Sequence, residues 1–265
     1  MDFLKRDIAP LTAKMWEELD ERAKEILKSN LKLRKIVDVE GPFGWQYSSY
    51  NLGTNELVES SADSFGWGLR KSLPLIEVRN PFTLKLWTLD DIERGNIAPN
   101  LEPLETAAKE IAKFENDIIL RGLEKANITG LYTLAKSNSI KSSQNNVGDF
   151  IVSLHNIKKR FIENGIEGPY SLVINKEVWE RLYSQQLSYP LNLLVNEVLN
   201  AKIELIHDLE QSFVVSTRGK DFKLILGQDL SLGYLRHVDE EVKLFFTETF
   251  TFYAVTPEAI VGLEF

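Results

Sequence analysis

The sequence predicts a mixed α+β fold with one long helix, long strands and an extended arm. Residues 101–126 carry apolar side chains at helical spacing over about seven turns. Residues 242–255 alternate between apolar and polar side chains, and at ~3.3 Å per residue such a strand is about 45 Å long. Residues 66–89 have an extended pattern that we interpret as part of a two-stranded arm. Because an isolated hairpin is only marginally stable in water, we expect the arm to lie on another surface.

The N-terminal part begins with an amphipathic helix predicted over residues 10–30. Its apolar side chains share one face, namely Leu11, Met15, Leu19, Ala23, Ile26 and Leu27. Alternation of valine with acidic residues predicts a short strand over 37–40, which the sequence Gly-Pro-Phe-Gly then ends. Residues 45–63 look irregular. Within the arm, Asn80-Pro81 predicts a turn, and Trp87 falls on the polar face of its strand.

The central and C-terminal parts alternate between helices and strands. The long helix has a buried face marked by Leu104, Ala108, Ile111, Phe114 or Glu115, and Ile118, and Asn127 can close it in the left-handed conformation. Residues 134–146 are predicted to form a polar loop. Asp149 is the predicted cap of a helix over 150–163, a short buried strand follows over 171–174, and Asn175 caps the next helix. Pro190 begins a further helix to about Leu199, and the last 65 residues are mostly strand.

Composition excludes several classes of protein. The 265 residues are 43% hydrophobic and 26% charged, which is typical of a globular protein. The chain has no cysteine, so disulfide scaffolds, cysteine-ligated metals and cysteine nucleophiles are excluded. The net charge of −8 disfavours a surface that binds DNA broadly. Charges near the N-terminus and the lack of a long apolar run predict a soluble, cytoplasmic protein without a signal peptide or membrane span.

A search for catalytic and metal-binding motifs finds no convincing site. Nucleophile elbows, phosphate loops and the HExxH zinc motif are absent from the sequence. Glu204 and His207 have the spacing of a di-iron ligand pair, but the segment reads as a strand, where positions i and i+3 point to opposite faces. We therefore expect no catalytic residue and no metal site.

Aromatic residues outside the predicted core indicate assembly. Trp45, Trp67 and Trp87 lie in loops or in the arm, where a small domain cannot easily bury them. One interpretation is that they pack against the protein's own core, and the alternative is burial between subunits, where aromatic residues are enriched. Together with the arm and the long strand, they favour obligate assembly.

Seven sequence blocks carry a resemblance to the encapsulins, the shell proteins of bacterial nanocompartments (the linocin-like bacteriocin family). The blocks lie in order along nearly the whole chain: MDFLKRDIAPLTAKMWEELDERA, RKIVDVEGPFGW, WGLRKSLPLIEVRNPFTLKLWTLDDIERG, FENDIILRGLEKA, GIEGPYSLVIN, DFKLILGQDLSLGY and LFFTETFTFYAV. Residues 132–147 and 184–188 depart most from the family pattern.

The resemblance implies the fold of a tailed-phage major capsid protein. It divides the chain into a peripheral domain, an axial domain and an extended loop that corresponds to the arm. The expected boundaries are 1–49 for the N-terminal helix and start of the peripheral domain, 50–91 for the extended loop, 92–129 for the peripheral domain with its long helix, 130–221 for the axial domain and 222–265 for the C-terminal strands of the peripheral domain.

The resemblance also implies a function in enclosure. Identical subunits, sixty copies or a multiple, would close into an icosahedral shell around a cargo enzyme. The expected cargo is a ferritin-like protein or a dye-decolourising peroxidase, which links the compartment to iron storage or oxidative stress. A C-terminal targeting peptide on the cargo would dock on the inner wall. No nucleic acid or membrane partner is expected.

Three groups of residues are the candidate sites under this resemblance. The docking candidates are Arg34, Ile36, Asp38, Leu230, Leu232 and Tyr234, although these residues could simply join a helix to a sheet. The fivefold pore loop corresponds to Ser184, Gln185, Gln186, Leu187, Ser188 and Tyr189, which predicts a polar, uncharged opening. No cofactor is required, but where a flavin is bound it would lie against Trp87, with Arg79 and Tyr189 as further contacts.

Two rival functions stay open at the level of sequence. One is a prophage major capsid protein that packages DNA, which the missing basic tail disfavours. The other is a secreted bacteriocin or protease, which the missing signal peptide and catalytic residues disfavour.

Overall fold

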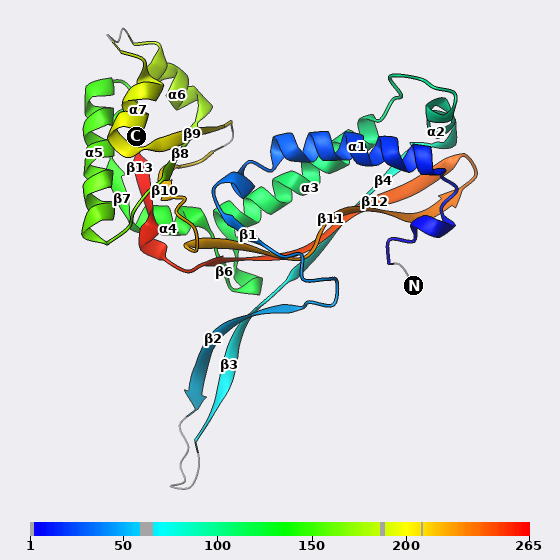
Figure 1. Cartoon of the computed structure of the whole chain (residues 1–265), viewed down its shortest axis with the longest axis horizontal. Helices are drawn as coiled ribbons and strands as arrows, with labels where there is room; N and C mark the ends of the chain where they lie inside the picture. The colour runs from blue at the N-terminus through cyan, green and yellow to red at the C-terminus, as the bar shows by residue number, and fades with distance from the viewer. Residues whose placement is uncertain (1–2, 59–65, 186–188, 208) are drawn as a thin grey trace.

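The computed structural model describes residues 3–58, 66–185, 189–207 and 209–265. Figure 1 shows two bodies that share long strands, with a thin arm that projects from between them. Helices and strands are mixed along the chain, which confirms the α+β class.

The first body is built on a four-stranded sheet in the order β1-β11-β12-β4. Its strands are β1 (Asp38–Glu40), β11 (Phe222–Val238), β12 (Glu241–Ala254) and β4 (Ile76–Lys85). The first strand runs parallel to β11, and the other pairs are antiparallel. The 14 residues of β12 confirm the long strand expected from its alternating sequence.

Two long helices lie side by side on this sheet (Figure 1). They are α1 (Ala13–Asn30) and α3 (Glu102–Arg121), and the shorter α2 (Leu86–Glu93) covers one end. The side chain of Thr12 accepts a hydrogen bond from the amide of Met15 and so begins α1 at a favourable cap. The buried face of α3 contains Glu115 rather than Phe114, which is 37% exposed. The helix ends at Arg121, with Gly122 as its C-cap, rather than at residue 126 as predicted. Asn127 adopts a left-handed conformation, but it closes a short 3₁₀ turn, η3 (Glu124–Ala126), and not the helix.

The second body contains a five-stranded sheet in the order β7-β13-β10-β8-β9. The strands are β7 (Ser139–Lys141), β8 (Tyr170–Asn175), β9 (Ala201–Ile206), β10 (Ser212–Ser216) and β13 (Ile260–Glu264). Its helices are α4 (Leu131–Ser137), α5 (Val147–Glu163), α6 (Lys176–Tyr183) and α7 (Leu191–Leu199). The remaining described elements outside the arm are the short pair β5 (Gly122–Leu123) and β6 (Ile128–Thr129) and the turns η1 (Arg6–Ile8), η2 (Leu33–Lys35) and η4 (Pro257–Ala259).

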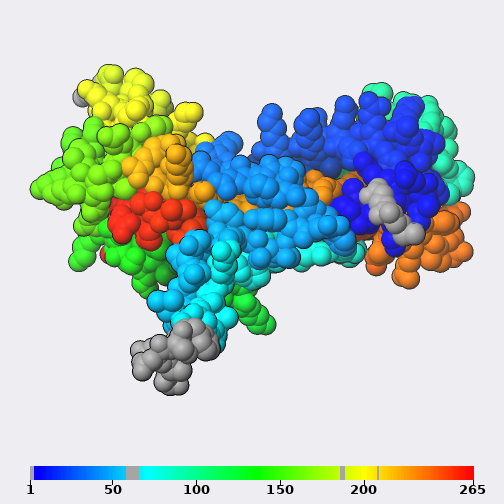
Figure 2. Space-filling model, turned by 60° about the horizontal axis from the view of Figure 1, so that its bottom comes forward, coloured from blue at the N-terminus to red at the C-terminus, as the bar shows by residue number. Residues whose placement is uncertain are grey.

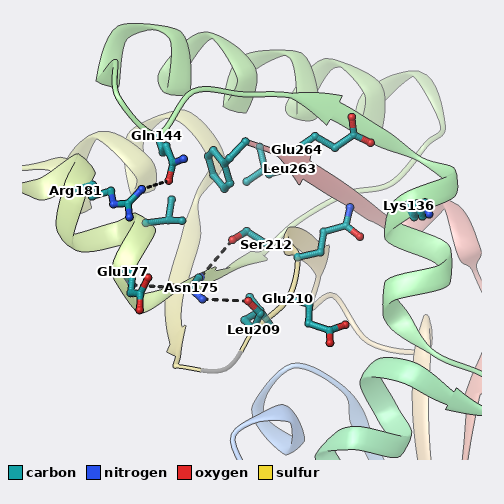
Figure 3. Close-up of a pocket in the computed structure, with 13 residues that line it drawn as sticks. Lys136, Gln144, Asn175, Glu177, Arg181, Leu209, Glu210, Ser212, Leu263 and Glu264 are labelled. Carbon is teal, nitrogen blue, oxygen red and sulfur yellow. Dashed lines mark hydrogen bonds between the residues drawn. The ribbon is translucent and has the colours of Figure 1, made fainter.

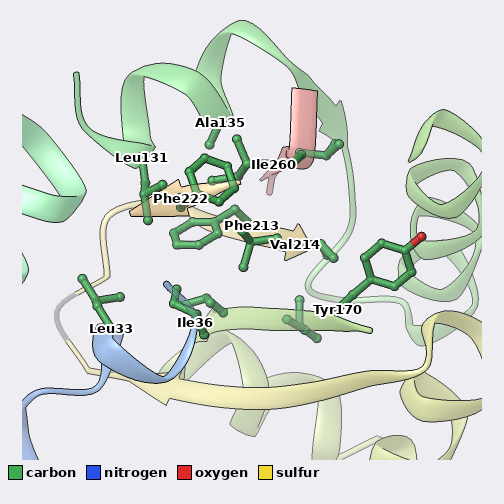
Figure 4. Packing of buried hydrophobic residues seen from close by; sticks show 14 of the residues in the cluster. Leu33, Ile36, Leu131, Ala135, Tyr170, Phe213, Val214, Phe222 and Ile260 are labelled. Atoms are coloured by element: carbon green, nitrogen blue, oxygen red, sulfur yellow. The ribbon is translucent and has the colours of Figure 1, made fainter. Parts of the chain in front are cut away.

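The apolar core is divided into two clusters. The larger cluster fills the second body and the adjoining end of the four-stranded sheet, and Figure 4 shows Phe213, Phe222 and Ile260 within it. The smaller cluster lies between α1, α3 and the far end of the same sheet, and it includes Leu19, Leu104 and Phe246. We call these the large cluster and the small cluster.

The arm is shorter than predicted. It consists of β2 (Ser49–Val58) and β3 (Trp67–Pro74), which form a two-stranded sheet of their own. Strand β4, which the predicted loop 50–91 includes, instead joins the four-stranded sheet. Figure 2 shows the arm, in blue and cyan, as a ridge that stands away from the rest of the surface.

Several local expectations about the N-terminal half are wrong. Residues 49–58 form a strand rather than irregular chain. Pro81 lies within β4 rather than in a turn, and β4 is an edge strand, where proline removes no required hydrogen bond. Trp87 lies in the first turn of α2 rather than on a strand.

Expectations for the C-terminal half also need correction at three places. The predicted polar loop over 134–146 contains the end of α4 and strand β7. The cap of α5 is Asn146 rather than Asp149, because the Asn146 side chain accepts hydrogen bonds from two amides of the first turn. Strand β13 belongs to the five-stranded sheet and not to the peripheral strands, which differs from the boundary at 222–265.

Candidate functional site

A groove between α1 and β11 is the candidate site that best combines apolar and charged side chains. It has a volume of about 510 Å³. Its apolar lining consists of Leu4, Ala23, Leu27, Leu31, Leu230, Leu232 and Phe246. Its polar lining consists of Arg6, Asp20, Lys24, Lys28, Arg34, Asp229 and Ser231. An apolar floor with charges of both signs around it is suited to an extended peptide with hydrophobic anchors.

Arg34 is at one end of the groove and binds three carboxylates. Its Nη1 donates to Asp229 Oδ1 at 2.9 Å and its Nη2 to Glu248 Oε1 at 2.6 Å. Its Nε and Nη2 both donate to Glu115. Burial alone would lower the pKa of Arg34, but hydrogen bonds and the charge of Glu115 outweigh burial and raise that pKa. The guanidinium is therefore fixed and charged, and only Asp229 among its partners lies near the surface.

The N-terminal segment is at the other end of the groove. The carbonyl of Leu4 accepts a hydrogen bond of 2.8 Å from the amide of Tyr234 on β11. Arg6 donates to both oxygens of Asp20 at 2.6 and 2.7 Å and lies over the ring of Trp16. Figure 2 shows this dark-blue segment against the orange end of the sheet. These contacts bring residues from both ends of the chain to one site.

The structure brings together three of the six predicted docking residues. Arg34, Leu230 and Leu232 all line the groove. Ile36 is 4% exposed and belongs to the large cluster, as Figure 4 shows. Asp38 accepts a hydrogen bond from the amide of Lys220, away from the groove lining.

Tyr234 is near the groove but does not line it. Its ring is buried in the small cluster, and its hydroxyl is 2.5 Å from His237 Nδ1. The groove residues that sequence reasoning missed are those of α1 and the N-terminal segment, especially Leu27, Arg6 and Asp20. Their only signal in the sequence is the amphipathic pattern of α1, which is equally typical of a helix that merely covers a sheet.

The predicted pore loop is only partly within the described residues. Ser184 follows α6, and its hydroxyl donates to the carbonyl of Arg181 at 2.9 Å. The side chain of Gln185 accepts from the amide of Val147 at 3.1 Å, and Tyr189 is 48% exposed. Gln186, Leu187 and Ser188 lie outside the described residues.

The three flavin candidates do not form one site within a single chain. Trp87 is 61% exposed on α2, and Tyr189 precedes α7, at the opposite end of the molecule (Figure 1). Arg79 lies on β4, pairs with Glu77 at 2.8 Å and lies near the ring of Phe245. Trp87 therefore presents an exposed ring, while Arg79 is engaged by Glu77 and Tyr189 lies far from both.

A second pocket, of about 530 Å³, lies in the second body between α6 and β13 (Figure 3). Arg181 donates to Gln144 there at 3.0 Å, and Asn175 holds the amide of Glu177 at 2.7 Å. In Figure 3 the labelled charged side chains lie apart from one another on separate elements and do not converge on a common point. Among the described residues, no cluster of three acidic or histidine side chains could hold a metal ion.

In the described part of the chain, no helix combines the length and apolar character required to cross a bilayer.

Comparison with known proteins gives consistent matches. Residues 1–251 match the family described as "Encapsulating protein for peroxidase". The "Type 1 encapsulin shell protein" of Brevibacterium linens is 36% identical over 266 residues, which span 100% of both chains. The protein of the same name from Rhodococcus erythropolis is 35% identical and spans 99% of this chain and 100% of its own.

Solved structures with the same architecture are capsids and capsid-like particles. A virus-like particle from Pyrococcus furiosus superposes with a TM-score of 0.67 at 17% identity, over 92% of this chain and 98% of the other. The capsid of the myovirus XM1 gives a TM-score of 0.58 at 13% identity, over 87% and 90% of the two chains. These likenesses confirm the predicted tailed-phage major-capsid fold.

Proposed function

The chain belongs to the family of encapsulating proteins for peroxidase, the type 1 encapsulin shell proteins, and from this premise we propose that it forms a closed shell around a cargo enzyme. In this proposal about sixty copies, or a multiple, assemble in the cytoplasm, because closed shells of identical subunits follow point-group symmetry. The subunit itself performs no chemistry. Its cargo would be a peroxidase or a ferritin-like enzyme, so any role in oxidative stress or iron storage belongs to that cargo.

The arm is the observation that carries this proposal. Two strands that pair only with each other are not stable alone in water. The arm nevertheless exposes three large apolar side chains, with Leu57 at 81%, Trp67 at 50% and Leu69 at 60%. Such surface is typical of a contact with another subunit. A neighbouring copy in a shell supplies the surface that the arm requires.

Substitution on the arm tests assembly. Leu57→Glu and Leu69→Glu introduce charge where a neighbour would pack, and Leu57→Met is the matched apolar control. We expect the wild type and the control to give uniform hollow particles by electron microscopy and light scattering, and the two charged variants to give small species. Uniform particles from both charged variants, or a stable monomer from the wild type, would overturn the proposal.

We further propose that the groove between α1 and β11 binds the C-terminal targeting peptide of the cargo. Its apolar lining supplies pockets for hydrophobic anchors, and its basic and acidic residues can fix the orientation of the peptide. Leu230 and Leu27 are partly buried on opposite walls, so a charge at either position changes the groove without entering the core. Ile36 is unsuitable for this test, because a charged substitution at a buried core position would disturb folding.

Co-purification of cargo tests the groove. Leu27→Asp and Leu230→Asp are each expressed with a peroxidase that carries its own C-terminal tail. Val152→Asp, at a 59% exposed position on α5, is the control. We expect particles from all three variants, with cargo lost from the two groove variants only. Normal cargo in both groove variants would exclude this site, while leaving the shell proposal intact.

For the openings of the shell, we propose entry limited by size rather than by charge. The described part of the loop at 184–189 contributes serine, glutamine and tyrosine side chains, and no charge lies between Leu182 and Asn196 in the sequence. Comparable uptake of cations and anions of similar size into loaded particles is expected. Strong discrimination between them would contradict this.

We also propose Trp87 as the contact residue for a flavin. Trp87 is exposed and could stack on an isoalloxazine ring, which is a favourable aromatic contact. Purified particles with yellow absorbance that Trp87→Ala abolishes would support this site. Colourless wild-type particles would argue against it.

Packaging of DNA is the second candidate function, because the solved structures of the same fold include phage capsids. The net charge of −8 does not favour retention of nucleic acid. An absorbance spectrum of nuclease-treated particles separates the two functions, since packaged DNA would survive the treatment.

A further inference from the structure

Four charged residues lie where the large and small clusters meet. They are Arg34 on η2, Glu115 on α3, Asp229 on β11 and Glu248 on β12, and we call them the charged junction. In β12, Glu248 lies between Phe246 of the small cluster and Phe250 of the large cluster.

The helix α3 and the strand β11 also pass from one cluster to the other at the charged junction. In α3, Glu115 lies between Ile111 of the small cluster and Ile118 of the large one. In β11, Asp229 lies between Leu226 of the large cluster and Leu232 of the small one. Three long elements therefore each carry a carboxylate where they pass from one apolar core to the other.

Charge does not balance at the charged junction. One guanidinium faces three carboxyl groups, and two of these, Glu115 and Glu248, have side chains with no exposed surface. Two nitrogens of Arg34 donate hydrogen bonds to Glu115. Glu248, by contrast, accepts from Arg34 at only one of its carboxyl oxygens, Oε1. The second oxygen, Oε2 of Glu248, is buried without a hydrogen-bond partner among the described residues. Burying a carboxylate oxygen without a donor costs more than burying a neutral carboxyl group, because an ion loses more hydration than a neutral polar group.

The surroundings of Glu248 favour its neutral form. Burial, followed by the charge of Glu115, raises its pKa well above the ordinary value of 4.5, and the charge of Arg34 opposes this only in part. Asp229 adds to the rise from β11. On β4, Glu77 and Arg79 flank Val78, which pairs with Glu248, so their side chains point to the opposite face of the sheet.

We propose that the Glu248 carboxyl acts as a proton switch: while protonated it holds the two clusters together, and its ionisation at rising pH loosens the subunit along the charged junction. Ionisation adds a second negative charge beside Glu115, with one guanidinium to compensate both. The helix α3 and the strands β11 and β12 are continuous through this region, so the expected change is local opening rather than separation of the bodies. This inference concerns the subunit itself and does not depend on the cargo.

The sign of the pH dependence follows from the raised pKa. At pH values between the pKa of Glu248 in the unfolded chain and its higher pKa in the folded chain, the folded chain retains a proton that the unfolded chain has lost. Stability therefore falls as pH rises across this interval and becomes independent of Glu248 above it. Glu248→Gln keeps the size and one acceptor oxygen but cannot ionise, so it imitates the protonated state.

The test compares the wild type with Glu248→Gln and with Glu241→Gln, an exposed position on the same strand. Infrared spectra of the full-length protein over a pH series should show a protonated carboxyl band that persists above the ordinary range of glutamate in the wild type and in the control but not in Glu248→Gln. Amide hydrogen exchange is corrected for the intrinsic dependence of the exchange rate on pH. The protection of residues 111–118 and 244–250 should then fall as pH rises in the wild type and in the control, but not in Glu248→Gln.

Two results would overturn the proposal. One is the absence from the wild type of any protonated carboxyl band above the ordinary range of glutamate. The other is an equal loss of protection with pH in Glu248→Gln and the wild type. If Glu248→Gln does not fold, the wild type alone decides: the band and the protection must disappear over the same pH interval, and protection that outlasts the band refutes the switch.

Discussion

Replacing Arg34 with methionine should be among the most damaging single changes to this subunit. The side chain is 17% exposed and donates hydrogen bonds of 2.5 to 3.0 Å to Glu115, Glu248 and Asp229. Methionine keeps much of the length and apolar contact but leaves Glu115 buried without a cation. Removing one partner of a buried ion pair typically costs about 3–5 kcal/mol.

The expected effect on thermal unfolding follows from this magnitude. For a chain of this size, each kcal/mol lost from the free energy of unfolding lowers the midpoint of thermal unfolding by ~2–4 °C, so the midpoint of Arg34→Met should fall by roughly 6–20 °C. The loss should be smaller at acid pH, where Glu248 is protonated with or without Arg34, because the charge of Arg34 is what opposes the rise in the pKa of Glu248. Scanning calorimetry at pH 5 and pH 8, at one protein concentration, measures both effects.

Arg94→Met is the matched control for this experiment. Arg94 pairs with Asp91 one helical turn away, and both side chains are about half exposed, at 54% and 43%. An exposed pair of this kind contributes about 0–1 kcal/mol, so the midpoint of the control should hardly change. If Arg34→Met loses no more stability than Arg94→Met, or loses the same amount at both pH values, then the buried charge is not what stabilises the charged junction.

Three further substitutions test elements of the fold by thermal unfolding. Asn146→Ala removes the cap of α5 and should cost about 1 kcal/mol; an unchanged midpoint would mean that another group satisfies the first-turn amides. Phe150→Ala empties a fully buried position in the large cluster and should cost about 3–5 kcal/mol, whereas a loss below about 1 kcal/mol would show that the core repacks. Gly122→Ala places a Cβ 2.4 Å from the carbonyl of Ile128 at a φ of +81° and should cost about 1–3 kcal/mol or more; tolerance of alanine there would contradict the described backbone.

The sequence predicts the elements that have one apolar face and misses those that do not. The helices α1 and α3 and the strand β12 each bury one side against a neighbour, so their periodicity is visible in the sequence. Strand β2 has no core to face, and its polar sequence carries no alternation, so it was interpreted as irregular. Pro81 was interpreted as a turn residue because edge position is a property of the sheet and not of the local sequence.

The candidate site could be predicted only in part for a related reason. Leu230 and Leu232 came from the family resemblance, while the α1 side of the groove is indistinguishable from an ordinary amphipathic helix. The charged junction did leave a signal. Glu248 interrupts an apolar alternation at an inward position, and Glu115 falls on the buried stripe of α3. A pair of acids at core positions on two elements indicates that the fold brings them to a common cation.

The order of the strands has a consequence for synthesis of the chain. Both sheets are completed by late segments, since β11 and β12 form the centre of one and β13 lies inside the other. Strand β4 leaves the ribosome more than 100 residues before β12, the strand with which it pairs. A nascent chain therefore cannot close either core, and its exposed apolar surface must be tolerated or chaperoned until residues 222–264 emerge. Incomplete chains are thereby excluded from any assembly that requires a folded subunit.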